Sequence, residues 1–190
     1  MGQPARQVFT FGEYVSMEEL ARVKHEFLDG QVWAMAGGTP EHAAVCASIT
    51  GLLTIALREK PCRTFSSDLR IRVRATGLGT YPDVTVICGR VELDPEDPKK
   101  VTAVNPVLLI EVLSPSTESY DRGEKLWHYQ KIPCVREIVL VAHDRQEIEV
   151  VRREGDGSWS RHVARAGDAV RLECLEAELP VDTIYRNPLA

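Results

Sequence analysis

The sequence predicts an α/β (α+β) fold in which a mixed central β-sheet is flanked by helices, with an N-terminal β-hairpin and a C-terminal β-meander. Three observations support this class. Residues 39–60 and 120–131 have the spacing and the end signals of helices. Short alternating or wholly apolar segments lie between and after them, as expected for strands. The 190 residues suffice for one substantial core, so we expect a single domain over residues 1–190.

The N-terminal part is predicted to contain a helix followed by a hairpin. Residues 16–27 have helical spacing, with Ser16 as the N-cap and Glu19 three residues later. The pair Asp29-Gly30 favours a tight turn between two short strands.

The next predicted element is a long, largely buried helix over residues 39–60. Thr39 is its expected cap, and Pro40 stands at the first helical position, where the missing N–H has no cost.

Strands dominate after this helix. Residues 64–75 alternate, so Leu69, Ile71 and Val73 are expected to face a core. The opposite face then carries Asp68, Arg70, Arg72 and Arg74. Three arginines on one strand face could contact a phosphate backbone, and a solvated face or a charged sheet edge is the plain alternative.

Another short strand begins at Pro82, and the polar residues 89–105 form a loop. Residues 136–141 and 147–153 are predicted to form a hairpin that turns at His143-Asp144-Arg145. The segment "SWSRHV" extends this hairpin into the meander.

Glu111 lies in the middle of an otherwise aliphatic strand. Six of the seven residues in 107–113 are Val, Leu or Ile, which is typical of a strand buried on both faces. A charge there costs several kcal/mol unless it is paired or bound to a cation. An ion pair with an arginine is one solution, and a metal ion is the other.

Two further residues are placed to share a site with Glu111. Asp83 stands at the start of the preceding strand, and Lys125 lies on the following helix with Asp121 one turn before it. If the two strands are adjacent, Asp83 and Glu111 converge and repel each other unless a divalent cation lies between them. Oxygen ligands favour Mg²⁺ or Mn²⁺. A solvated helix lysine is the plain alternative for Lys125.

Composition excludes several classes. The net charge of −5 argues against bulk electrostatic binding of nucleic acid, although it allows a local basic strip. No apolar run is long enough for a membrane span. The five cysteines are scattered and form no C-x-x-C pair, so we expect reduced thiols and a cytoplasmic protein.

The residues carry a resemblance to a known family. The run "PDVTVI…NPVLLIEVLSPSTESYDRGEKLWHYQKIPCVREIVLV", together with "HEFLDGQVWAMAGGTPEH", resembles the Uma-type branch of the PD-(D/E)XK nuclease superfamily. The resemblance covers most of the chain and implies a restriction-endonuclease-like fold. It also implies Mg²⁺-dependent hydrolysis of phosphodiester bonds in nucleic acid, with DNA favoured, and a possible homodimer.

The resemblance also implies roles for individual residues. Asp83 and Glu111 would hold the metal with the Val112 carbonyl, and Glu26 resembles an additional N-terminal acidic ligand. The superfamily pattern places a lysine at position 113, where this chain has leucine. Lys125 is then the implied replacement, acting from the helix. The alternative function is a non-catalytic descendant of the fold that serves as a DNA-binding or oligomeric interaction module.

Overall fold

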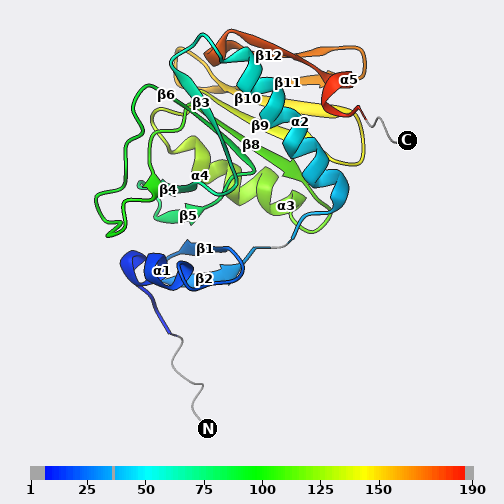
Figure 1. Ribbon diagram of the computed structural model, residues 1–190. Helices are drawn as coiled ribbons and strands as arrows, with labels where there is room; N and C mark the ends of the chain where they lie inside the picture. Colours follow the sequence, from blue (N-terminus) through cyan, green and yellow to red (C-terminus); the bar gives the residue numbers. More distant parts are fainter. Residues whose placement is uncertain (1–6, 36, 187–190) are drawn as a thin grey trace.

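The computed structural model describes residues 7–35 and 37–186, and its centre is a six-stranded mixed sheet (Figure 1). The strand order is β11-β10-β9-β8-β6-β3. The bounds are β3 Cys62–Ser66, β6 Val84–Cys88, β8 Leu108–Leu113, β9 Glu137–Ala142, β10 Glu147–Arg153 and β11 Trp159–Arg165. Strands β8 and β9 are parallel, whereas the other neighbours are antiparallel. The pairing of β6 with β8 confirms the prediction that the Asp83 and Glu111 segments lie side by side.

A second sheet has the order β2-β1-β5-β4-β7. Its bounds are β1 His25–Leu28, β2 Gln31–Ala34, β4 Arg70–Val73, β5 Leu78–Thr80 and β7 Thr102–Ala103. The β1–β2 hairpin turns at Asp29-Gly30, as predicted, and both residues have the positive φ that such a turn requires. A separate antiparallel pair, β12 (Ala169–Leu172) and β13 (Ala177–Pro180), completes the strands of the described residues. The mixed-sheet α+β class is therefore confirmed, with the meander at β9–β11.

The helices are short except for one. Their bounds are α1 Phe11–Glu18, α2 Pro40–Ala56, α3 Glu118–Tyr120, the π-helix η1 Asp121–Lys125, α4 Leu126–Gln130, the 3-10 helix η2 Glu173–Leu175 and α5 Val181–Ile184. Across residues 7–35 and 37–186, no helix combines the length and the apolar character needed to cross a bilayer.

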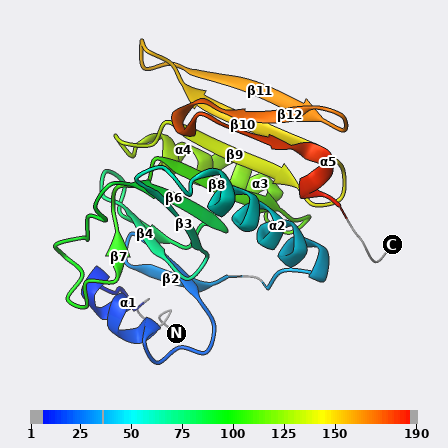
Figure 2. The same ribbon diagram turned by 45° about the horizontal axis from the view of Figure 1, so that its top comes forward.

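Both faces of the central sheet are covered, which explains why β8 is apolar throughout. Leu108, Ile110 and Val112 pack in a core with α2, α5 and the β12–β13 pair, which lie together on one side of the sheet (Figure 2). Leu109 and Leu113 belong to the second core, which contains residues of α4 and of the second sheet. Glu111 points to this second side, because side chains alternate along a strand.

Two helix predictions require correction. The first helix begins at Phe11 and ends at Glu18, because Thr10 and Glu13 form a capping box; Ser16 lies inside it. Helix α2 begins as predicted, with Thr39 as its cap and Pro40 in its first turn. It is not largely buried, since it packs one stripe on the sheet and leaves Ile55 75% exposed.

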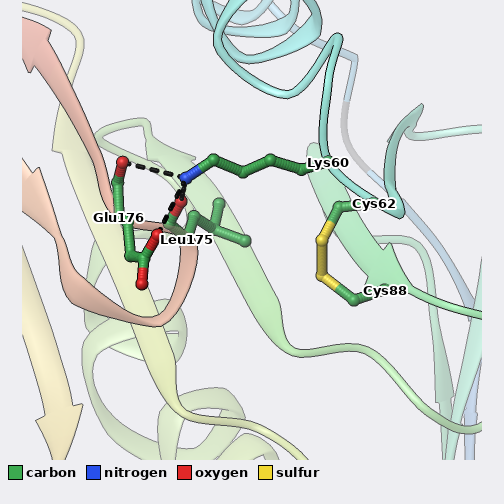
Figure 3. Close-up of a disulfide and its surroundings, with 5 residues drawn as sticks. All are labelled: Lys60, Cys62, Cys88, Leu175 and Glu176. Carbon is green, nitrogen blue, oxygen red and sulfur yellow. Dashed lines mark hydrogen bonds and ion pairs between the residues drawn. A yellow bond between two sulfur atoms is a disulfide. The ribbon is translucent and has the colours of Figure 1, made fainter.

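A disulfide joins the edge strand β3 of the central sheet to its neighbour β6. Cys62 of β3 and Cys88 of β6 are directly opposite in the antiparallel register, and their sulfur atoms are bonded (Figure 3). The prediction of five reduced thiols is therefore wrong, because the register brings these two together; Cys46, Cys134 and Cys174 are free. Nearby, Lys60 donates hydrogen bonds to the carbonyls of Leu175 and Glu176, which ties the segment after α2 to the turn before β13 (Figure 3).

Candidate active site

A buried lysine is the centre of the site. The Lys125 side chain is 5% exposed, and its Nζ lies 3.0 Å from Glu111 Oε1 and 3.3 Å from Glu26 Oε1. Asp121 Oδ1 lies 3.6 Å from the same nitrogen. The three carboxylates come from β8, β1 and the π-helix, so two sheets and one helix meet at this ammonium. The plain alternative of a solvated lysine is therefore wrong.

Glu111 has two polar partners, although it lies in an otherwise apolar strand. Besides Lys125, the Tyr129 hydroxyl donates a hydrogen bond of 2.5 Å to Glu111 Oε1 from α4. The buried carboxylate is thus paired with a lysine, and the alternative of an arginine partner is wrong. Lys125 ends a π-helical turn between α3 and α4, a local distortion that is frequent at functional sites.

Asp83 is positioned by the neighbouring strand and by α2. Since Val84 is opposite Ile110 in the register, Asp83 reaches the backbone of Val112, whose N–H donates 2.7 Å to Asp83 Oδ2. His42 Nε2 lies 3.2 Å from the same oxygen. Within the described part of the chain, Asp83 Oδ1 accepts no hydrogen bond and is free for another ligand.

Glu26 is held near the ammonium by the second sheet. The Thr80 hydroxyl donates to Glu26 Oε1, the oxygen that also faces Lys125. The Tyr120 hydroxyl is buried and has no hydrogen-bond partner among the described residues. A donor without a partner at this place fits a site that is completed by a bound group.

These side chains line one open cavity of about 270 Å³. Its wall contains Glu26, Asp83, Glu111, Asp121, Lys125, His42, Tyr120 and Trp33, together with small residues of the segments before α2 and after β8. Asp83, Glu111 and Lys125 therefore face the same solvent-reachable space. A larger cavity, of about 580 Å³, lies elsewhere, between Arg72, Arg74, Glu96 and Lys131. It is lined by none of the four site carboxylates, Glu26, Asp83, Glu111 and Asp121.

The charges of the cluster do not balance. Four carboxylates and one ammonium line the cavity. Burial together with the charges of Asp83 and Asp121 raises the pKa of Glu111 to about 8, against the opposing effect of Lys125. Burial also raises the pKa of Asp121. Although burial by itself lowers the pKa of Lys125, Glu111 and the neighbouring anions raise it well above its ordinary value. The lysine therefore stays charged, and the excess of negative charge contributes to the raised pKa values of Glu111 and Asp121.

This excess fits a divalent cation. The free oxygen of Asp83 and the Glu111 carboxylate are oxygen donors on the same cavity wall. The tightest cluster of potential ligands in the described residues is a different one, formed by His42, Cys46 and Asp83, whose ligand atoms lie within 4.8 Å of one another. Neither Glu26 nor Glu111 belongs to this cluster. The Glu26 carboxylate instead faces Lys125 and accepts a hydrogen bond from Thr80.

The arginine stripe is rearranged relative to the prediction. Arg70 and Arg72 are buried, not solvated, because the N-terminal segment covers them: Arg70 lies over the Tyr14 and Tyr81 rings, and Arg72 lies over Phe11. Arg74 is exposed. The predicted contact of this strand with nucleic acid stays a prediction, and the structure leaves Arg74 as the accessible member of the three.

Sequence reasoning missed several members of the site. By its position near the start of α2, His42 is typical of a packing or capping residue, and its contact with Asp83 depends on how that helix lies across the sheet. Tyr129 and Thr80 carry no sequence signal, since one lies in an amphipathic helix and the other in a three-residue strand. Asp121 did carry a signal, its spacing of four residues from Lys125.

Comparison with known proteins identifies a family and two relatives to which this chain is similar. The family model Uma2, described as "Putative restriction endonuclease", matches residues 11–182. An uncharacterised protein of Synechocystis sp. is 38% identical over 92% of this chain and 90% of its own length. A second uncharacterised protein of the same organism is 29% identical over 80% of this chain and 85% of its length.

Among solved structures, the chain is similar to a protein from Anabaena variabilis described as a putative nuclease belonging to DUF820. The TM-score is 0.71, and the match covers 87% of this chain and 91% of the other. The sequence identity of 17% makes this a similarity of fold.

Proposed function

Because the chain belongs to the Uma2 family of restriction-endonuclease-like proteins, we propose that it is a metal-dependent endonuclease that hydrolyses phosphodiester bonds of nucleic acid, with DNA as the favoured substrate. The observation that carries the proposal is the position of Lys125. It approaches Glu111 from the helix, to 3.0 Å, in a cavity that Asp83 also lines. In this proposal, Lys125 replaces at the same carboxylate the lysine that the superfamily pattern places at position 113.

Asp83 and Glu111 would hold Mg²⁺ or Mn²⁺. When bound, such a cation lowers the pKa of a coordinated water and neutralises charge on a phosphate. The Val112 N–H fixes one oxygen of Asp83, which leaves the other for a ligand. The Tyr129 hydroxyl and the ammonium hold Glu111 in one rotamer, which pre-organises the carboxylate for binding.

The role of Lys125 follows from its charge state. The surrounding anions keep its pKa high, so at neutral pH it is an ammonium that can donate hydrogen bonds but cannot accept a proton. It would therefore orient the attacking water or stabilise negative charge that develops on the phosphate. Tyr120, whose hydroxyl has no partner among the described residues, offers a second neutral donor in the same cavity.

The test combines cleavage with metal binding. We expect cleavage of plasmid or single-stranded DNA that requires Mg²⁺ or Mn²⁺ and is lost in Asp83→Ala. Calorimetric titration should detect metal binding in the wild type and lose it in Glu111→Ala. Glu92→Ala, which removes an exposed carboxylate outside the cavity, is the matched control. Metal binding without cleavage of DNA or RNA would favour the alternative, a non-catalytic nucleic-acid-binding or oligomeric module.

A further inference from the structure

Trp33 of the edge strand β2 stands beside the carboxylate cluster. In the β1–β2 hairpin, Trp33 is directly opposite Glu26, whose carboxylate faces Lys125. Directly opposite residues of an antiparallel pair point to the same side of the sheet, with Cβ atoms about 5 Å apart. The indole therefore lies on the site side of the hairpin, and it lines the same cavity as Asp83 and Glu111.

Packing does not account for this tryptophan. The hairpin residues Phe27 and Val32 point to the other side and pack in the small core with α1. Trp33 belongs to no hydrophobic core of the described residues and is 37% exposed. A large aromatic side chain in this position offers contact area to a ligand.

The other two tryptophans are engaged. Trp127 lies against His128 and under the Lys131 ammonium, and Trp159 lies under the Arg153 guanidinium. Within residues 7–35 and 37–186, Trp33 makes no aromatic or cation–π contact of this kind. Its ring is free to stack on another planar group.

The chemistry of the cavity indicates which planar group. Asp83 is 17% exposed, and Glu111 and Lys125 are 5% exposed, so the polar groups lie at the floor of the cavity. A backbone phosphate must enter to reach them. A strand whose bases are unpaired can bend into such a recess, whereas bases inside a duplex are stacked on each other and offer no free face.

We propose that Trp33 is a specificity-determining residue that stacks on an unpaired nucleobase next to the scissile phosphate. The substrate class is then single-stranded or locally unpaired nucleic acid. This inference rests on the proposed nuclease function, and it adds the form of nucleic acid that the site accepts. Base–aromatic stacking is tolerant of sequence because every base has a π-face, so little base preference is expected.

The first experiment measures single-turnover cleavage of a DNA oligonucleotide against protein concentration, which separates apparent affinity from the rate constant. Trp33→Ala should weaken the apparent affinity for a single strand by about 10-fold, the range of one stacked base. Trp33→Phe should retain most of the affinity, and the rate constant should change little. Trp127→Ala removes a more exposed tryptophan outside the cavity and should have no effect.

An abasic scan of the oligonucleotide makes the test specific. At one position next to the cleaved bond, loss of the base should weaken wild-type binding by about as much as Trp33→Ala does, about 10-fold. The same abasic strand should bind Trp33→Ala no more weakly than the intact strand, because the two changes remove one interaction. Additive losses, or an equal effect of Trp33→Ala on single strands and on the matched duplex, would overturn the inference.

A second measurement separates this inference from the proposed function. In the Trp127→Phe/Trp159→Phe variant, Trp33 is the remaining tryptophan of the three. Single-stranded DNA should quench its fluorescence, and the abasic strand should quench it less. Cleavage without this quenching overturns the Trp33 inference and leaves the nuclease proposal intact. Quenching without cleavage supports stacking and rejects catalysis, and the absence of both rejects the two together.

Discussion

At the residue scale, the site depends on one lysine that serves several carboxylates. Lys125 faces Glu111, Glu26 and Asp121, each from a different element or turn. An ammonium at this position compensates buried negative charge as well as acting on a substrate. In the proposed mechanism, structural and catalytic roles are therefore combined in one side chain, and experiments on it must measure both.

Lys125→Met is expected to lower the cleavage rate on the order of 10²–10³-fold, the effect of removing one donor at a developing charge. Methionine keeps an apolar stem but leaves Glu111 and Glu26 without their cation, so the metal-free protein should lose about 3 kcal/mol of stability. Lys125→Arg should restore little activity, because its planar fork fits the carboxylates differently. Cleavage assays and urea unfolding in EDTA measure the two effects.

The buried position of Leu113 limits the complementary experiment. Leu113 is 2% exposed and packs in the second core, so Leu113→Lys would bury an ammonium among apolar side chains. We therefore expect no recovery of activity when Leu113→Lys is added to Lys125→Met. Recovered cleavage in this double variant would show that the strand position can still supply the cation.

The pKa of Glu111 predicts a pH-dependent stability. Burial raises this pKa from 4.5 to about 8, so the folded state favours the protonated carboxyl. This contribution is complete below the unfolded pKa and is lost as the pH rises through the folded pKa. Without a cation, the wild type should therefore lose stability between these two values.

Glu111→Gln imitates the protonated form and removes this dependence. In EDTA, it should be close to the wild type near about pH 5 and be more stable by several kcal/mol near about pH 9, since the pKa rises from 4.5 to about 8 and a pKa difference of one corresponds to about 1.4 kcal/mol. Urea unfolding at both pH values measures the difference. Mg²⁺ should restore the stability of the wild type at high pH and leave the glutamine variant unchanged. Equal stability differences at both pH values would contradict the pKa assignment.

At the scale of elements, the site is held by contacts between segments that are far apart in sequence. The β1–β2 hairpin brings Glu26 and Trp33, β8 brings Glu111, and the π-helical turn brings Lys125. At the β3 edge of the central sheet, a disulfide joins Cys62 to Cys88, which are 26 residues apart along the chain. The disulfide therefore fixes the start of β3 to the end of β6, the strand that follows Asp83.

We expect the denatured, unreduced protein to present three reactive thiols in a thiol titration, those of Cys46, Cys134 and Cys174. Closing a loop of this length constrains the unfolded chain by about 3 kcal/mol, so Cys62→Ser/Cys88→Ser should lower the free energy of unfolding by about that amount. Cys134→Ser is the matched control and should change it little. Five reactive thiols would show that the pair is reduced.

At the scale of the whole molecule, the central sheet separates two cores, and the site lies where the second sheet and α4 meet the Glu111 face of β8. One chain offers one such site. The homodimer implied by the family resemblance stays a prediction, founded on the need for two sites to cut two strands.

Light scattering in the presence of Mg²⁺ is expected to give twice the chain mass of 21.2 kDa. A monomeric mass together with cleavage of single strands would contradict the dimer and would agree with a substrate that has unpaired bases. A cleavage rate per chain that does not change with protein concentration would likewise indicate a monomer.

The sequence by itself determined the features that depend on short-range pattern. The apolar run around Glu111 predicts a strand covered on both faces, and Asp29-Gly30 and Thr39-Pro40 specify a turn and a helix start. The resemblance around "IEVLSPST" and "DRGEKL" identified Asp83, Glu111 and Lys125 as a set, and these residues line one cavity. Periodicity and turn chemistry are local, so they can be read without knowledge of the partners.

Only the tertiary structure decided which surfaces are covered. Arg70 and Arg72 alternate like solvated residues, yet the aromatic rings of the N-terminal segment bury them. His42 meets Asp83 because α2 lies across the sheet, and Cys62 meets Cys88 because β3 and β6 pair in one register. The physical reason is that burial, pairing and pKa depend on contacts between distant segments, and no local pattern specifies which segment arrives.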